Sequence, residues 1–151
     1  MIERVISGGQ TGVDRAALEV ALALGLPCGG WCPKGRWAED GTLDPRYPLQ
    51  ETPSEEYAER TEWNVRDSDG TLILARAALS GGTAQTAAYA KRLDKPCLVL
   101  DPMQPESGAA FKRWISAHHI RVLNVAGPRE SHAPGIQAQA AEFLRNVFTA
   151  Q

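Results

Sequence analysis

Short apolar runs alternate with longer stretches of helical periodicity along this chain. Five short runs predict strands, at residues 3–7, 26–31, 71–75, 97–100 and 121–125. Five longer stretches predict helices, at residues 12–24, 52–66, 84–93, 106–118 and 134–149. Because strands and helices take turns, the pattern predicts an α/β fold with a mostly parallel sheet of about five strands.

Local signals mark several of the helix ends. Gly25 follows the first helix as a C-terminal capping glycine, and Thr52-Pro53-Ser54-Glu55 has the order expected at a helix start. The first helix is apolar on nearly every side, which predicts packing on a sheet. In the last two helices apolar residues recur at helical spacing, and they are Phe111, Trp114 and Ile115 in one and Ile136, Ala140, Phe143, Leu144 and Val147 in the other. Residues 32–50 are polar and rich in glycine, proline and tryptophan, so they predict a long loop of the kind that often carries function.

The composition narrows the class of protein. A chain of 151 residues suits one domain, and no apolar run is long enough to cross a membrane. Three cysteines, an odd number, argue against a disulfide framework and favour the reducing cytoplasm. A net charge of −2 gives no electrostatic reason to expect nucleic-acid or membrane binding.

The first strand ends in a glycine turn that leads directly into a helix. Glycine allows backbone N–H groups to approach a ligand, and a helix N-terminus favours an anion such as phosphate. Thr11 and Asp14 fit a variant of the capping box. The turn lacks the lysine of a P-loop and is not G-x-G-x-x-G, so a tight structural turn remains an equal alternative. Its candidate phosphate-binding residues are Gly8, Gly9, Gln10, Thr11 and Gly12.

Further polar turns follow other predicted strands. Because parallel strands end at the same edge of a sheet, these turns predict a binding crevice there. Cations within them suit a bound anion, although each is also compatible with a solvated surface position. The candidates in these turns are Lys34, Gly35, Arg36, Gly81, Gly82, Thr83, Gly127, Pro128, Arg129, Glu130 and Ser131, and Arg15 beside the first turn is a further candidate cation.

Other residues give weaker signals. Asp14 has two interpretations, a ligand contact or a first-turn acid favoured by the helix dipole. Trp31 and Trp37 suit either stacking on a flat heterocycle or ordinary packing. The three cysteines are predicted to be buried thiols, no metal site is expected, and His132 is the histidine best placed to touch a ligand. Catalytic residues are not visible in the sequence.

Several motifs, taken together and in this order, resemble the putative molybdenum carrier family. The resemblance covers nearly the whole chain. The matching blocks are Ser7-Gly8-Gly9-Gln10-Thr11-Gly12-Val13-Asp14-Arg15-Ala16-Ala17, Cys32-Pro33-Lys34-Gly35-Arg36, Ala38-Glu39-Asp40-Gly41, Arg60-Thr61-Glu62, Asn64-Val65, Asp67-Ser68-Asp69-Gly70-Thr71, Gly81-Gly82-Thr83 and Asn124-Val125-Ala126-Gly127-Pro128-Arg129-Glu130-Ser131.

This resemblance implies a three-layer Rossmann-like domain, with helices on both faces of the sheet and a glycine-rich site at its edge. The family is related to the lysine-decarboxylase-like LOG proteins and to DprA-like domains. Its name implies a molybdenum cofactor, which is a phosphorylated and anionic pterin, and a nucleotide suits the same residues equally well. LOG proteins carry a third glycine and a catalytic glutamate at the second glycine turn, and this chain has neither at residues 80–86.

Two functions follow as hypotheses. The first is a binding protein for a phosphorylated, flat, anionic ligand. The second is an enzyme acting on a nucleotide or a nucleotide-derived ligand, with Asp14 or Glu130 as the acid or base and Asp69 as a further candidate. An interaction module with purely structural turns is the remaining alternative. Relatives also suggest a homo-oligomer, a dimer or a tetramer.

Overall fold

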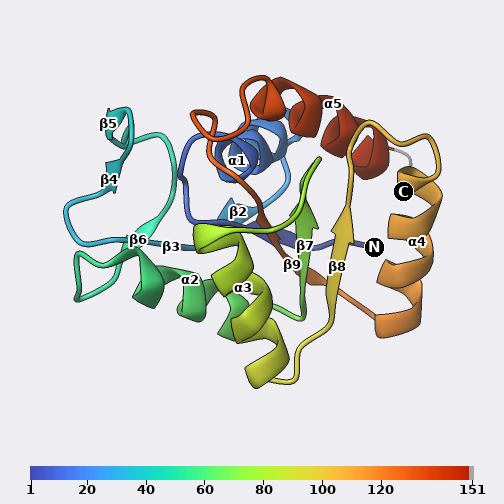
Figure 1. Cartoon of the computed structure of the whole chain (residues 1–151), viewed down its shortest axis with the longest axis horizontal. Coiled ribbons are helices and arrows are strands. Elements are labelled where there is room, and N and C mark those ends of the chain that lie inside the picture. Colours follow the sequence, from blue (N-terminus) through green and yellow to red (C-terminus); the bar gives the residue numbers. More distant parts are fainter. Residues whose placement is uncertain (150–151) are drawn as a thin grey trace.

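A computed structural model describes residues 1–149 and contains one main sheet of five parallel strands. The strand order across this sheet is β2-β1-β9-β7-β8 (Figure 1). The strands are β1 (Arg4–Ile6), β2 (Cys28–Gly29), β7 (Gly70–Leu74), β8 (Cys97–Leu100) and β9 (Val122–Ala126). The parallel α/β sheet predicted from the alternating pattern is therefore confirmed.

Helices cover both faces of this sheet, which gives the three layers (Figure 1). One face carries α1 (Val13–Leu24), α4 (Ser107–His118) and α5 (Ile136–Thr149), and these three helices share one hydrophobic core with the strands. The other face carries α2 (Tyr57–Arg66) and α3 (Gly81–Arg92), which pack against each other. The helices of both layers begin near the edge where the strands end, so their first turns surround that edge.

The predicted apolar faces of the last two helices form much of the core. In α4, Phe111 and Trp114 are buried, and Ile115 packs against them at the edge of the cluster. In α5, every predicted core position is buried, because residues spaced by three or four fall on one side of a helix. Those positions are Ile136, Ala140, Phe143, Leu144 and Val147.

Helix starts were predicted less well than helix ends. Gly25 ends α1 in the left-handed conformation, with φ of 71°, as expected. In contrast, α2 begins at Tyr57 rather than at residue 52, because the Thr52 hydroxyl donates to the Ser54 carbonyl and holds a turn there. Helix α3 begins earlier than predicted and includes Gly81, while α5 begins two residues later.

The segment between β2 and α2 is more ordered than the predicted loop. It contains two small sheets, a parallel pair of β3 (Trp31–Cys32) with β6 (Gln50–Glu51), and an antiparallel pair of β4 (Trp37–Ala38) with β5 (Gly41–Thr42). The predicted strand at residues 26–31 is also split, because Gly30, with φ of 127°, turns the chain away from the main sheet. A second hydrophobic cluster joins this segment to α1 through Leu18.

The main sheet and α1 approach very closely at Gly127. A Cβ atom at this position would lie 2.5 Å from the Leu74 carbonyl oxygen and 2.5 Å from Cγ2 of Val13. We therefore expect Gly127→Ala to lower the free energy of unfolding by about 1–3 kcal/mol, as overpacking does.

Urea denaturation measures this effect. Gly108→Ala in α4 is the matched control, because a Cβ atom there meets only Val147 at an ordinary 3.9 Å. The control should be neutral or slightly stabilising, since alanine favours a helix. Equal stability of Gly127→Ala and the wild type would contradict the tight packing described for Gly127.

Candidate functional site

A pocket of about 500 Å³ lies at the edge of the sheet where β1, β7 and β9 end. Its lining comes from the turn after β1, from α2, from the loop between β7 and α3, and from the loop between β9 and α5. Both its size and its place suit a small ligand, because ligand pockets are typically about 300–1,000 Å³ and open parallel sheets bind at this edge. The predicted crevice is thus present.

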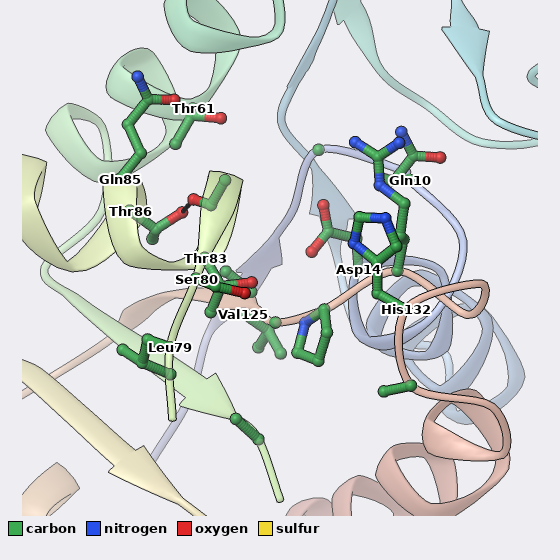
Figure 2. Close-up of a pocket in the computed structure, with 18 of the residues that line it drawn as sticks. Gln10, Asp14, Thr61, Leu79, Ser80, Thr83, Gln85, Thr86, Val125 and His132 are labelled. Carbon is green, nitrogen blue, oxygen red and sulfur yellow. Dashed lines mark hydrogen bonds between the residues drawn. The ribbon is translucent and has the colours of Figure 1, made fainter. Parts of the chain in front are cut away.

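Polar side chains face each other across this pocket (Figure 2). The wall formed by α2 and α3 is rich in hydroxyl groups. The polar residues labelled on that side in Figure 2 are Thr61, Ser80, Thr83, Gln85 and Thr86. Gln10, Asp14 and His132 lie on the opposite side. A ligand in the pocket would therefore meet hydrogen-bonding groups on two sides.

The start of α3 offers open backbone donors to the pocket. Ser80 is its N-cap residue, and the Ser80 side chain makes no capping hydrogen bond to the first turn. The first N–H groups of a helix have no acceptor within the helix, and Gly82 and Thr83 line the pocket at this point. The N-terminal end of the helix dipole adds a positive partial charge there. This helix start is suited to an anion.

Two of the other helix starts at this edge, those of α1 and α5, are already occupied by protein groups. In the turn before α1, the N–H of Gly12 donates to Oε1 of Gln137 at 2.9 Å, and the N–H of Thr11 donates to Oε1 of Gln10 at 3.1 Å. At α5, the Glu130 carboxylate accepts from the N–H groups of Gly135 and Gln137. The proposed capping of α1 by Thr11 and Asp14 is also absent, since the Thr11 hydroxyl instead accepts from the Glu130 N–H.

Asp14 and Arg60 form a buried ion pair at the pocket. Nη1 of Arg60 lies 3.3 Å from Oδ2 of Asp14, and the two residues are only 7% and 8% exposed. Burial raises the pKa of Asp14 to about 6, although the Arg60 charge opposes this shift most strongly, followed by the N–H of Gln10. Asp14 can therefore exchange a proton near neutral pH.

Further cations surround the mouth of the pocket. The guanidinium groups of Arg60 and Arg129 lie 5.3 Å and 5.7 Å from the centre of the Tyr57 ring. Among residues 1–149, no hydrogen bond or ion pair engages the Arg129 guanidinium. Arg76 donates to the Pro134 carbonyl, which links the loop after β7 to the loop after β9. Arg129 is therefore the cation best placed to accept a new anionic partner.

The structure brings together some of the residues proposed from the sequence and leaves others outside the pocket. Those in its lining are Gly8, Gln10, Asp14, Gly82, Thr83, Gly127, Pro128 and Arg129. Those outside the lining are Gly9, Thr11, Gly12, Arg15, Lys34, Gly35, Arg36, Gly81, Glu130 and Ser131.

Several residues outside the lining have structural partners. Arg15 forms a two-pronged ion pair with Asp40, at 2.9 Å and 3.0 Å. Arg36 donates to backbone carbonyl groups, including those of Tyr47 and Leu49, and so holds the segment before β6. A Cβ atom on Gly9 would overlap the Leu49 side chain. These residues stabilise the segment that covers α1.

The tryptophans and cysteines singled out in the sequence lie outside the pocket lining. Trp31 packs edge-on against Trp63, with ring centroids 4.7 Å apart, and Trp37 is 54% exposed. Cys32 is buried, whereas Cys28 and Cys97 are half-buried, and burial raises the pKa of all three thiols. Within residues 1–149, no group of three metal-ligating side chains comes together, and no helix has the length and apolar character needed to cross a membrane.

Sequence reasoning missed the contribution of α2 to this site. This helix supplies Tyr57, Arg60 and Asn64 to the lining, and β9 supplies Asn124. The sequence did contain a signal for this contribution, because α2 has an unusually polar face for a helix that packs on a sheet. Arg76 was missed because an exposed arginine after a strand has no distinguishing pattern.

Strand order defines the class of protein. Numbered along the chain, the five strands of the main sheet lie in the order 2-1-5-3-4. If the last strand came first in the chain, the same order would read 3-2-1-4-5, which is the start of the Rossmann order. The pocket lies where that order reverses, between β9 and β7. The protein is therefore a Rossmann-like domain with permuted connectivity.

The chain belongs to the circularly permutated YpsA SLOG family, cpYpsA, whose model matches residues 5–148. A solved structure, described as a putative molybdenum carrier protein from Syntrophus aciditrophicus SB, is 47% identical with a TM-score of 0.94. It matches over 97% of this chain and 94% of its own. The resemblance noted from the sequence is thereby confirmed.

A second solved structure is more distant. It is (E)-4-hydroxy-3-methyl-but-2-enyl diphosphate reductase, at 12% identity and a TM-score of 0.41 over 96% of this chain and 59% of its own. None of the curated proteins matches this sequence.

Proposed function

We propose that this protein binds a phosphorylated, flat, anionic ligand in the pocket between β7 and β9. The observation that carries the proposal is the open N-terminus of α3 in a cavity that also contains Arg129, whose guanidinium lies over the Tyr57 ring and has no hydrogen bond or ion pair within residues 1–149. The phosphate would accept from the N–H groups of Gly82 and Thr83, with Arg129 as its charged partner.

The flat part of the ligand would lie beside Tyr57. Arginine side chains and aromatic rings both stack on planar heterocycles, and Tyr57 lies next to two guanidinium groups. The hydroxyl groups of α2 and α3 would surround the linker between ring and phosphate. Of the candidate residues proposed from the sequence, we therefore propose that only those lining the pocket contact the ligand.

Molybdenum cofactor is one candidate for this ligand, as cargo, because a relative at 47% identity is named as a molybdenum carrier. The donor set fits its phosphate and its planar pterin. The cysteines lie outside the pocket lining, so the protein would hold the organic part of the cofactor rather than its metal.

An enzyme acting on a nucleotide-derived ligand is the second candidate. The specific observation that favours it is Asp14, whose pKa of about 6 allows it to donate or accept a proton at neutral pH. Glu130 is less suitable for this role, since it caps α5. Turnover of a bound nucleotide that is lost in Asp14→Asn would favour the enzyme, and binding without turnover would favour the carrier.

Gly82→Pro tests the phosphate position with little change to the fold. Gly82 lies in the first turn of α3, where proline is tolerated, and a Cβ atom there meets nothing within 4 Å. Because proline lacks the N–H, calorimetric titration with 5′-nucleotides and a phosphorylated pterin should show about five- to twenty-fold weaker binding.

Gly82→Ala is the matched control, because it adds a Cβ atom but keeps the N–H donor. Its affinity should stay much closer to that of the wild type. If Gly82→Pro binds as tightly as Gly82→Ala, the phosphate does not lie on this helix start.

A further inference from the structure

We infer that Asp14 selects ligands whose ring carries a 2-amino-4-oxopyrimidine edge, the edge that guanine and pterin share. The inference rests on the proposed function, because it assumes that a phosphorylated heterocycle enters this pocket. It names the chemical class of that heterocycle and the residue that reads it.

Asp14 supplies a carboxylate to the lining of the pocket. It lies in the first turn of α1, and Figure 2 shows its side chain directed into the cavity and toward the side that bears Ser80 and Thr83. Nη1 of Arg60 donates to Oδ2 of Asp14, and the backbone N–H groups of Gln10 and Gly8 also interact with the carboxylate. A carboxylate offers about four acceptor positions over its two oxygens, so capacity remains beside these protein groups for a ligand that donates hydrogen bonds.

Arg60 connects the residue that would meet the face of a ligand ring, Tyr57, with the residue that would meet its edge, Asp14. The Arg60 guanidinium contacts the Asp14 carboxylate at 3.3 Å and lies 5.3 Å from the centre of the Tyr57 ring. A flat ring that stacks beside Tyr57 therefore has its edge close to Asp14. In this position the carboxylate meets ring N–H and amino groups rather than the phosphate, which it would repel.

The chemistry of the edge decides between related purines. Guanine presents an N–H and an amino group side by side, and a carboxylate accepts from both. Inosine lacks the amino group, xanthine replaces it with a carbonyl oxygen that a carboxylate repels, and adenine presents an unprotonated ring nitrogen there. Only the 2-amino-4-oxo edge of guanine or pterin pairs fully with Asp14.

Calorimetric titration of the full chain with GMP, IMP, XMP and AMP at pH 7.5 tests the inference. These ligands share their ribose and phosphate and differ only in the base. GMP should bind at least about ten-fold more tightly than each of the others, since a hydrogen bond to a charged group is worth that much. Equal binding of GMP, IMP and AMP would overturn the inference while leaving the anion pocket in place, whereas failure of all four would overturn both.

Asp14→Asn provides a second test. It compares the affinities of one variant for two ligands, and partial unfolding would lower both affinities equally. An asparagine amide donates to the 2-oxo group of xanthine, so the ratio of GMP affinity to XMP affinity should fall at least about ten-fold. Asp94→Asn makes the same chemical change at an exposed site after α3 and should leave the ratio unchanged. An unchanged ratio in a folded Asp14→Asn variant would overturn the role of Asp14. If that variant does not fold, the wild-type series alone decides.

Discussion

Replacing Arg60 with methionine should destabilise the protein by about 3 kcal/mol at pH 8, as removal of one partner from a buried ion pair does. Asp14 would then be left buried without its main counter-charge, since Arg60 is the strongest influence that lowers its pKa. Urea denaturation of the wild type and of Arg60→Met measures the difference.

The destabilisation should depend on pH in a defined direction. The pKa of Asp14 is already about 6 in the folded protein against an ordinary 3.8, so the charged form weakens folding above pH 6 by about 3 kcal/mol even in the wild type. Stability from this group is thus greatest at low pH and is lost as the pH rises through 6. Without Arg60 the pKa rises further, so the gap between variant and wild type should be large at pH 8 and small at pH 5.

A surface pair provides the control for this experiment. Arg92 and Glu62 form an ion pair in which both side chains are at least 35% exposed. Arg92→Met should therefore change stability by less than about 1 kcal/mol, with no trend between pH 5 and pH 8. A gap for Arg60→Met that stays constant over this range would show that Asp14 is not the group responsible.

Replacing Arg129 with alanine should weaken binding of a phosphorylated ligand by about 1.5–3 kcal/mol, which is roughly 10- to 150-fold. The reason is that its guanidinium lies in the pocket lining and no protein group within residues 1–149 engages it by a hydrogen bond or an ion pair. Stability should change little, because the residue is half-buried and has no ion pair to lose. Titration calorimetry and thermal melting together separate the two effects.

Two further variants make this result specific. Arg129→Lys keeps the charge but loses the planar fork of the guanidinium, so its affinity should be intermediate. Arg145→Ala removes an exposed arginine of α5 that is not part of the pocket lining, so this variant should bind the ligand normally. Wild-type affinity in Arg129→Ala would remove this residue from the site.

The fold was predictable because its signals are local. Alternating strands and helices, the left-handed Gly25 and the apolar face around Phe111 each depend on neighbours in the sequence. The start of α2 was predicted five residues too early, because the Thr52 hydroxyl donates to the Ser54 carbonyl and closes a turn instead of capping a helix. The small sheets around Trp37 are two residues per strand, which is too short for any periodic signal.

The candidate site was only partly predictable, because it depends on strand order. The sequence identifies turns that follow strands, and parallel pairing places them at one edge. It does not say that β9 lies between β1 and β7, and this arrangement brings Gly82 and Arg129 together while leaving Lys34 outside. The sequence also does not reveal that the donors of Gly12 are already satisfied by Gln137, a residue 125 positions away.

The most direct measurement is a nitrogen–proton NMR titration of the labelled protein with GMP, which follows every backbone N–H separately. A phosphate on the start of α3 should move the signals of Gly82 and Thr83 most strongly, while those of Gly12 and Gly35 stay nearly unchanged. Large shifts at Gly12 or Gly35, with Gly82 and Thr83 unmoved, would contradict the assignment of this helix start as the anion site.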